Sequence, residues 1–272
     1  MLADHGYGSR RQMELWITAG RVTVNGEAAH IGQRVTAADS IAVDGRSLRH
    51  APDEPSRVLV VNKAVGVICT RHDPEGRATV FDDLPALRTG RWISIGRLDV
   101  QTSGLLLLTN DGALAHRMMH PSTGLDREYA VRVGGQLSDE QIAALKSGVL
   151  VEGVFLKFSD IRYYDGSGHN HWYHVVLLEG RNREVRRLFE AVGVGVSRLK
   201  RVRYGPVALP STLRIGQRRD LPEDDLKALY KLLKLPLSLG KQGRRSRRGT
   251  PKERQAERTM MLPYPQLPPS AG

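Results

Sequence analysis

The segment 96–112 constrains the fold of this chain more than any other part of the sequence. Trp92–Ile95 alternates between apolar and polar residues, which predicts a strand. Leu105–Thr109 is a short apolar run, typical of a buried strand, and Asn-Asp-Gly turn chemistry follows it. Asp99 is therefore expected in a loop between two core strands, with Arg97 close by. Rigid strands often hold loops that perform chemistry, although an isolated loop aspartate is more often a turn residue.

Other motifs along the chain change that balance. The segment GRLDVQTSGLLLLTNDG (96–112) resembles the signature of the RsuA family of ribosomal RNA pseudouridine synthases. Three further stretches match this family in the same order: NKAVGVICTRHDPEGRATVFDDLP (62–85), HPSTGLDREYAVRV (120–133) and EGRNREVRRLFEAVGVGVSRLKRVRYGPVALP (179–210). An N-terminal segment similar to the S4 RNA-binding module completes the resemblance, which covers about residues 1–235. The motifs are most similar to the branch that modifies large-subunit RNA.

The resemblance implies an α+β fold with a mixed, largely antiparallel sheet bent around a central cleft, and the strand-rich, turn-punctuated sequence agrees. We expect an S4-like module in 1–50, a linker in 51–57, a catalytic domain in 58–236, and a basic, proline-rich tail in 237–272 that is disordered without RNA. The first helix of the family's S4 module usually begins several residues earlier, so we expect either that the true start of the chain lies earlier or that this module is trimmed and weaker.

The resemblance also implies three catalytic residues. Asp99 aligns with the essential carboxylate at the ribose, and Tyr129 aligns with the residue that lies against the target uracil. Arg186 aligns with the basic residue that pairs with the aspartate, and a nearby cation would keep that carboxylate ionised. Alternation in 128–133 independently places Tyr129 on the inward face of a strand, where its hydroxyl needs a partner. Whether Asp99 acts as a nucleophile or as a base on the sugar stays open.

Helical spacing separates two neighbouring arginines. The sequence predicts a helix over 183–192 that is capped by Asn182. Arg186 lies on the flank of its apolar stripe, from where it can reach a carboxylate, whereas Arg187 points away from the stripe, toward solvent or phosphate.

Positive charge indicates a polyanionic partner. The net charge is +12, and basic residues concentrate in the N-terminal module and in 196–204, which is predicted to be a strand with one basic face. An ordinary solvated basic face is the alternative for the module. The residues expected to contact RNA are Arg10, Arg11, Arg21, Arg77, Arg97, Arg181 and Arg187.

Two further patterns favour structural roles. Asp111 is predicted to cap the helix that follows it rather than to take part in catalysis. His169, His171 and His174 do not share one face of an extended chain, so a hairpin with incidental histidines is favoured over a metal site. Cys69 is the single cysteine, which excludes an intrachain disulfide and fits a reducing cytosol.

The function implied by the resemblance is isomerisation of a specific uridine to pseudouridine in ribosomal RNA, expected in 23S rRNA near the peptidyl-transferase region. A 16S rRNA enzyme and a non-catalytic S4-type RNA-binding or assembly protein are the alternatives. A carboxylate hydrolase would need a second dedicated carboxylate, which the matched motifs do not suggest. The reaction retains all atoms, so neither cofactor nor metal is expected. No stretch approaches the ~20 apolar residues of a membrane span, and we expect a cytoplasmic bacterial monomer without a membrane partner.

Overall fold

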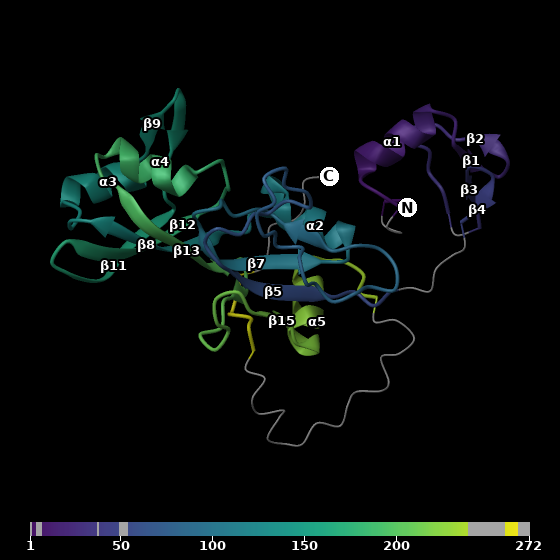
Figure 1. Cartoon of the computed structure of the whole chain (residues 1–272). Helices are drawn as coiled ribbons and strands as arrows, with labels where there is room; N and C mark the ends of the chain where they lie inside the picture. Colours follow the sequence, from purple (N-terminus) through teal and green to yellow (C-terminus); the bar gives the residue numbers. More distant parts are fainter. Residues whose placement is uncertain (1, 4–6, 37, 49–53, 239–258, 266–272) are drawn as a thin grey trace, which may run out of the picture.

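Two sheet-based units organise the part of the chain that this computed structural model describes, residues 2–3, 7–36, 38–48, 54–238 and 259–265 (Figure 1). Residues 51–53 of the expected linker lie outside the described residues. The domain boundaries therefore stay a prediction, and each unit is described by itself.

The N-terminal unit combines one helix with a four-stranded sheet in the order β2-β1-β3-β4. The helix begins where the sequence predicts, because the Ser9 side chain accepts a hydrogen bond from the N–H of Gln12 (3.1 Å). Asn25 and Gly26 have φ values of 54° and 89°, as a two-residue hairpin turn requires. Its elements are α1 (Arg10–Thr18), β1 (Val22–Val24), β2 (Glu27–Ala28), β3 (Ile41–Val43) and β4 (Arg46–Ser47).

The larger unit is built on a nine-stranded sheet with the order β11-β12-β8-β13-β7-β5-β15, in which β14 pairs with β13 and β6 pairs with β7. The pairing of β13 with β7 is parallel, and the other pairings in this sheet are antiparallel. The predicted mixed, largely antiparallel sheet is thus confirmed. Its strands are β5 (Val58–Lys63), β6 (Ile93–Ile95), β7 (Ser103–Thr109), β8 (Arg127–Gly134), β11 (Asp160–Ser167), β12 (Asn170–Leu177), β13 (Val196–Tyr204), β14 (Val207–Ala208) and β15 (Arg218–Asp220).

Helices cover this sheet at two places. In Figure 1, α3 and α4 lie near β8, β11 and β12, whereas α2 and α5 lie near β5 and β7. A separate two-stranded hairpin, β9–β10, projects beside α4. These elements are α2 (Gly112–Met119), the 3₁₀ turn η1 (Pro121–Thr123), α3 (Asp139–Ser147), β9 (Val149–Val151), β10 (Val154–Leu156), α4 (Glu184–Ala191) and α5 (Glu223–Leu232).

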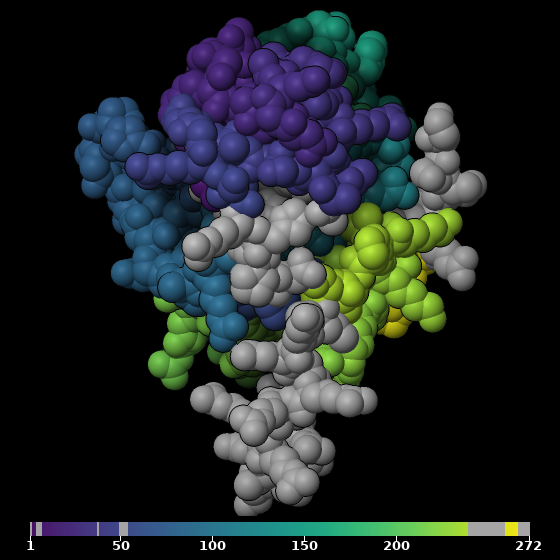
Figure 2. Space-filling model, turned by 90° about the vertical axis from the view of Figure 1, so that its right-hand side faces the viewer, coloured from purple at the N-terminus to yellow at the C-terminus, as the bar shows by residue number. Residues whose placement is uncertain are grey.

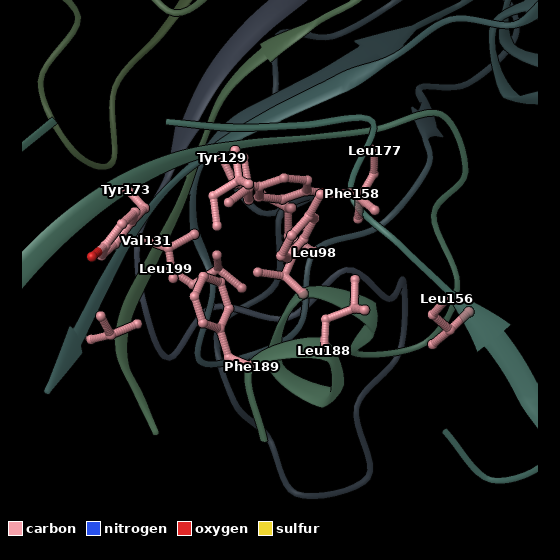
Figure 3. Close-up of a cluster of buried hydrophobic side chains, with 14 of the residues drawn as sticks. Leu98, Tyr129, Val131, Leu156, Phe158, Tyr173, Leu177, Leu188, Phe189 and Leu199 are labelled. Atoms are coloured by element: carbon pink, nitrogen blue, oxygen red, sulfur yellow. The ribbon is translucent and has the colours of Figure 1, made fainter. Parts of the chain in front are cut away.

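Apolar side chains pack against both faces of the central strands, because alternate residues of a strand point to opposite faces. On β7, Leu105 and Leu107 join a buried cluster with α2 and α5, whereas Leu106 and Leu108 join a second cluster with α3 and α4. Figure 3 shows the second cluster, in which Phe189 of α4 packs among side chains of the strands. The predicted buried strand at 105–109 is confirmed, since all five residues are fully shielded from solvent.

Two local expectations are wrong. Asn182 does not cap α4: the N-cap is Arg183, which has a φ of 48° and makes no side-chain capping bond. The run 196–204 forms β13, but the pairing register shifts between residues 201 and 203, and Arg201 is buried instead of joining one basic face. Arg201 lies two residues after buried Leu199, so strand alternation places it on the same inward face, whereas Lys200 points to the other face.

The expected disordered tail is also wrong for residues 259–265. Met260 is buried in the cluster that contains α2 and α5, and its N–H donates to Asp225 Oδ2 (2.6 Å). Val207 and Met261 form an antiparallel bridge, and the Tyr264 hydroxyl donates to Asp126 Oδ1 (2.9 Å). The segments 239–258 and 266–272 lie outside the described residues.

Candidate active site

The loop between β6 and β7 places Asp99 as the sequence predicts, between two core strands. Leu98 anchors the loop because its side chain is buried in the cluster of Figure 3. The N–H of Thr102 donates to the carbonyl oxygen of Asp99 (3.0 Å), and the N–H of Gly66 donates to that of Val100 (2.8 Å). Asp99 itself is half-buried. The loop is therefore attached to its surroundings on both sides of the carboxylate.

Gly104 brings a second strand close to this loop. Its φ is 99°, and a Cβ at this position would lie 2.2 Å from the carbonyl oxygen of Arg201 on β13. Only glycine fits such an approach. The parallel pairing of β7 with β13 therefore depends on Gly104. This pairing determines which side chains of β13 lie beside the Asp99 loop.

A cavity of about 790 Å³ opens beside Asp99 and is the candidate active site. Tyr129 of β8 and two of the predicted RNA-contacting arginines, Arg97 and Arg181, line it together with Asp99. The structure thus brings four of the predicted site residues to one concave surface. Arg186 does not line the cavity.

Tyr129 has the position that strand alternation predicts. It shares the inward face of β8 with Val131 and Val133, and its side chain is only 8% exposed. Figure 3 shows Tyr129 within the apolar cluster, and the same residue lines the cavity. A base that entered the cavity would therefore meet an aromatic ring held rigidly by the core.

Arg186 acts on the Asp99 loop through backbone contacts. Its side chain is 7% exposed; Nη1 donates to the carbonyl oxygen of Val196 (2.8 Å), and Nη2 donates to that of Gln101 (3.2 Å). Among the described residues it makes no direct ion pair with Asp99, which differs from the expected pairing. Burial lowers the pKa of Arg186, while the charge of Asp99 opposes this shift.

Lys63 is a cation near Asp99 to which the sequence analysis gave no role. It ends β5, is only 1% exposed, and donates from Nζ to the carbonyl oxygens of Ala64 and Thr102 (2.8 Å each). Burial lowers its pKa, whereas the charge of Asp99 opposes this shift. The sequence feature that could have identified Lys63 is its place at the end of an apolar strand, because buried lysines are rare unless they are paired.

Two further cations surround one aromatic ring in the cavity wall. The guanidinium carbons of Arg127 and Arg201 lie 4.7 and 5.1 Å from the ring centroid of Tyr204. Arg127 also donates to the Tyr204 hydroxyl (2.9 Å) and to the carbonyl oxygens of Leu125 and Leu178. All three side chains are buried and line the cavity. No local sequence signal identifies these three residues as neighbours, because the strand pairing that joins them is a property of the tertiary fold.

Glu184 is a buried carboxylate in the cavity wall, which Glu179 also lines. It is 6% exposed, and its Oε2 accepts a hydrogen bond from the N–H of Arg181 (2.9 Å). Burial raises its pKa, and the charge of Glu179 adds to the shift. A buried carboxyl of this kind favours the neutral form.

Four of the seven arginines expected to contact RNA are ion-paired with acidic side chains. Arg21 pairs with Asp44, Arg77 with Asp73 and Glu75, Arg181 with Glu179, and Arg187 with Glu152. Arg187 is 21% exposed and is the only partly exposed residue in 184–189, so its position toward solvent or phosphate stays a prediction. Arg10, Arg11 and Arg97 are exposed. RNA contact by any of these arginines stays a prediction.

Two structural assignments are confirmed. Asp111 caps α2, since its Oδ1 accepts from the N–H groups of Ala113 (2.8 Å) and Leu114 (3.2 Å). His169 lies in the turn of the β11–β12 hairpin, and His174 contacts Glu128 (2.7 Å).

The site combines an anchored carboxylate, an aromatic wall and several cations around one cavity. Such a cavity can hold a nucleotide that has left its stack and can attract its phosphate. The carboxylate at its edge can attack the sugar or remove a proton from it. No helix in the described part of the chain is long and apolar enough to cross a membrane.

Comparison with known proteins gives consistent results for both units. Residues 57–191 match the model of the RNA pseudouridylate synthase family, and residues 1–41 match the S4 domain. One solved structure, described as "Crystal structure of pseudouridylate synthase", has a TM-score of 0.59 and 28% sequence identity, and the match covers 84% of this chain and 96% of the other.

Two curated relatives have the same name, "Ribosomal large subunit pseudouridine synthase B". The one from Pseudomonas aeruginosa is 56% identical over 232 residues, which are 84% of this chain and 60% of the relative. The one from Escherichia coli (strain K12) is 52% identical over 240 residues, which are 87% of this chain and 82% of the relative. The chain thus spans less than two thirds of the first relative and most of the second.

Proposed function

Because this chain belongs to the RNA pseudouridylate synthase family, we propose that it converts uridine to pseudouridine in ribosomal RNA. The observation that supports this most directly is the anchored carboxylate of Asp99 at a cavity walled by Tyr129 and by buried cations. The names of the relatives favour large-subunit RNA, which is 23S rRNA in bacteria, and the sequence motifs favour the peptidyl-transferase region. The enzyme would act as a cytoplasmic monomer.

In the proposed reaction, the target nucleotide leaves its stack and enters the cavity, with its base against Tyr129. Asp99 acts at the ribose while the bond between C1′ and N1 breaks. The base then turns, and a bond between C1′ and C5 forms. The proton lost from C5 is balanced by the proton that N1 gains, so no atom is added and no redox step occurs.

The surrounding cations would support Asp99 in two ways. Lys63 and Arg186 hold the carbonyl oxygens of Thr102 and Gln101, which fixes the loop that follows the carboxylate. Their positive charges also interact favourably with the negative charge of Asp99. Arg97 would contact phosphate or fill the place of the flipped nucleotide.

Asp99→Asn tests this proposal. The substitution keeps the size of the side chain but removes the charge, so we expect turnover to fall by several orders of magnitude while folding and RNA affinity are nearly unchanged. The measurement is tritium release from ribosomal RNA labelled at uracil C5. Asp111→Asn is the control, because asparagine caps a helix about as well as aspartate. Substantial turnover by Asp99→Asn, together with loss of turnover in Asp111→Asn, would overturn the site assignment.

The same assay separates the remaining alternatives. Tritium release from 16S but not from 23S rRNA would assign the enzyme to small-subunit RNA. RNA binding by the wild-type chain without tritium release from either RNA would instead indicate a non-catalytic binding or assembly protein.

A further inference from the structure

Two arginines next to the Asp99 loop carry positive charge that no acidic side chain of the described residues neutralises. Arg71 lies in the segment between β5 and β6, and Arg91 lies two residues before β6. Arg57, which lies over the ring of Trp92 in the same region, is instead paired with Asp220 (2.9 Å). Arg71 and Arg91 therefore differ from their neighbour in being available to an external anion.

Contacts with two aromatic residues hold Arg71 in one position. Its guanidinium carbon lies 4.4 Å from the ring centroid of Phe81, and its Nη2 donates to the carbonyl oxygen of Trp92. Phe81 in turn packs against the buried cluster of Figure 3. These contacts involve one face and one corner of the guanidinium, and Arg71 is exposed, which leaves part of its planar edge for a ligand. That edge matches the geometry of a phosphate group.

Arg91 is the second cation in this region. It directly precedes Trp92, whose carbonyl oxygen Arg71 binds, and its Nε is shielded from solvent without a hydrogen-bond partner among the described residues. Burial lowers the pKa of Arg71, and the charge of Arg91 adds to this shift, as two like charges near each other require. A bound anion would relieve the repulsion and supply acceptors to both side chains.

The pair lies within reach of the active site. The N–H of Leu98 donates to Cys69 Sγ (3.4 Å), and both Cys69 and Ser94 line the cavity. Arg71 follows Cys69 by two residues, and Trp92 precedes Ser94 by two residues. Two residues span at most about 7 Å of chain. In Figure 2, the blue surface at the left of the molecule belongs to this part of the chain, between β5 and β7, so part of it lies on the outside of the molecule.

We propose that Arg71 and Arg91 together bind one backbone phosphate of the RNA strand next to the target nucleotide. This proposal rests on the proposed function, because it takes the substrate to be RNA. The partner is identified by its chemistry: a planar, immobilised guanidinium and a second cation suit a phosphodiester, and the short chain distance to the cavity suits a phosphate close to the flipped base.

Equilibrium binding of a ribosomal RNA fragment, measured by fluorescence anisotropy over a range of salt concentrations, tests the proposal. In Arg71→Ala and Arg91→Ala we expect weaker binding, and a log–log salt slope that is shallower by about 0.7, the value for one phosphate contact of a single strand. If both arginines bind the same phosphate, the double variant should lower the slope no further. A slope lowered by about twice that value would overturn the shared site.

Arg162→Ala is the matched control, because it removes the same charge from an exposed arginine that is paired with Asp160 on β11. Equal weakening in this control would show that only net charge matters and would overturn the proposal. Wild-type affinity and slope in both Arg71→Ala and Arg91→Ala would overturn it as well. Arg91→Ala is the cleaner variant, since Arg71 also packs on Phe81; a thermal melt verifies that each variant is folded.

The outcome is independent of the catalytic proposal. Binding is measured whether or not pseudouridine forms, so an inactive wild-type enzyme would contradict the proposed function while leaving the phosphate site testable. In an active enzyme, both variants should raise KM with kcat nearly unchanged, because neither arginine lines the cavity.

Discussion

At the residue scale, the side chains of the site have positions with two different origins, local sequence pattern and tertiary packing. Asp99 lies in its loop because apolar runs define the strands on both sides, and Tyr129 faces the core because β8 alternates without interruption. The contacts of Arg186 and Lys63 could not be predicted in the same way. They depend on where a helix and a strand distant in sequence meet the Asp99 loop, which is a property of the tertiary fold.

Glu184 is the residue that most directly tests whether Asp99 is the single essential carboxylate. Glu184→Gln retains an oxygen that can accept the hydrogen bond from Arg181 but cannot ionise. We expect its turnover to stay within about tenfold of the wild-type value, since a positioning role needs only the acceptor, whereas general base catalysis typically contributes more. Tritium release measures this; a loss as large as that of Asp99→Asn would give Glu184 a role in the chemistry.

The same variant should change the pH dependence of stability. Burial raises the pKa of Glu184 in the folded protein above its ordinary value of 4.5, so the folded state binds the proton more tightly than the unfolded state. The stabilisation from this group is complete below pH 4.5 and is lost as the pH rises through the raised pKa. Urea unfolding midpoints measured from about pH 4 to about pH 8 should therefore fall less with pH in Glu184→Gln than in the wild type.

At the element scale, hydrophobic periodicity predicted the helices and strands, and local backbone geometry caused the errors. Asparagine is a favoured N-cap, but Asn182 does not cap α4. Arg183 adopts a left-handed conformation at the N-cap position, and the Glu184 side chain accepts a hydrogen bond from the N–H of Arg181. In β13, alternation places Arg201 on the inward face, and the register shift between residues 201 and 203 brings Tyr204 onto that face as well. Neither a left-handed non-glycine residue nor a bulge has a reliable sequence signal.

The start of α2 gives a prediction at this scale. Asp111 accepts two backbone hydrogen bonds through Oδ1, and its Oδ2 accepts one from the hydroxyl of Tyr230 on α5 (2.6 Å). Asp111→Ala should therefore lower the free energy of unfolding by about 2–3 kcal/mol, from the lost cap and the unsatisfied buried hydroxyl. Asp111→Asn should cost less, because its Oδ1 still caps the helix and the Tyr230 hydroxyl can rotate to accept from Nδ2.

Urea unfolding of Asp111→Ala, Tyr230→Phe and the double variant measures the coupling between α2 and α5. The two single effects should not add, since both remove the same hydrogen bond. Turnover at saturating RNA should stay at the wild-type level. A variant that kept its stability but lost turnover would contradict the structural role of Asp111.

At the scale of the whole molecule, strand order is what the sequence could not predict. β13 inserts between β7 and β8, and this brings the cations of one motif beside the Asp99 loop of another motif. The docking of residues 259–265 was likewise not predicted. The segment is short and lies between basic and proline-rich stretches, so the composition of the region predicts disorder although a few residues pack, among them Met260 and Tyr264.

This C-terminal segment should stabilise the catalytic unit. Met260 is 3% exposed, and Asp225, itself 6% exposed, accepts hydrogen bonds from the Thr259 hydroxyl (2.5 Å) and the Met260 N–H (2.6 Å). Ending the chain after residue 258 removes the apolar side chain and leaves a buried carboxylate without these partners. The two losses together should cost at least about 3 kcal/mol. For a unit of this size, that loss lowers Tm by roughly 6–12 °C.

Thermal unfolding of two truncated chains measures this contribution. A chain that ends after residue 265 keeps every contact described for the segment, so its Tm should match that of the full chain. A chain that ends after residue 258 should melt earlier, and Met260→Ala alone should account for about 2–3 kcal/mol of the loss, as expected for a large side chain removed from a core. An unchanged Tm in the shorter chain would mean that residues 259–265 contribute no net stability. If the shorter chain loses turnover only above its lowered Tm, the segment stabilises the fold without a role in catalysis.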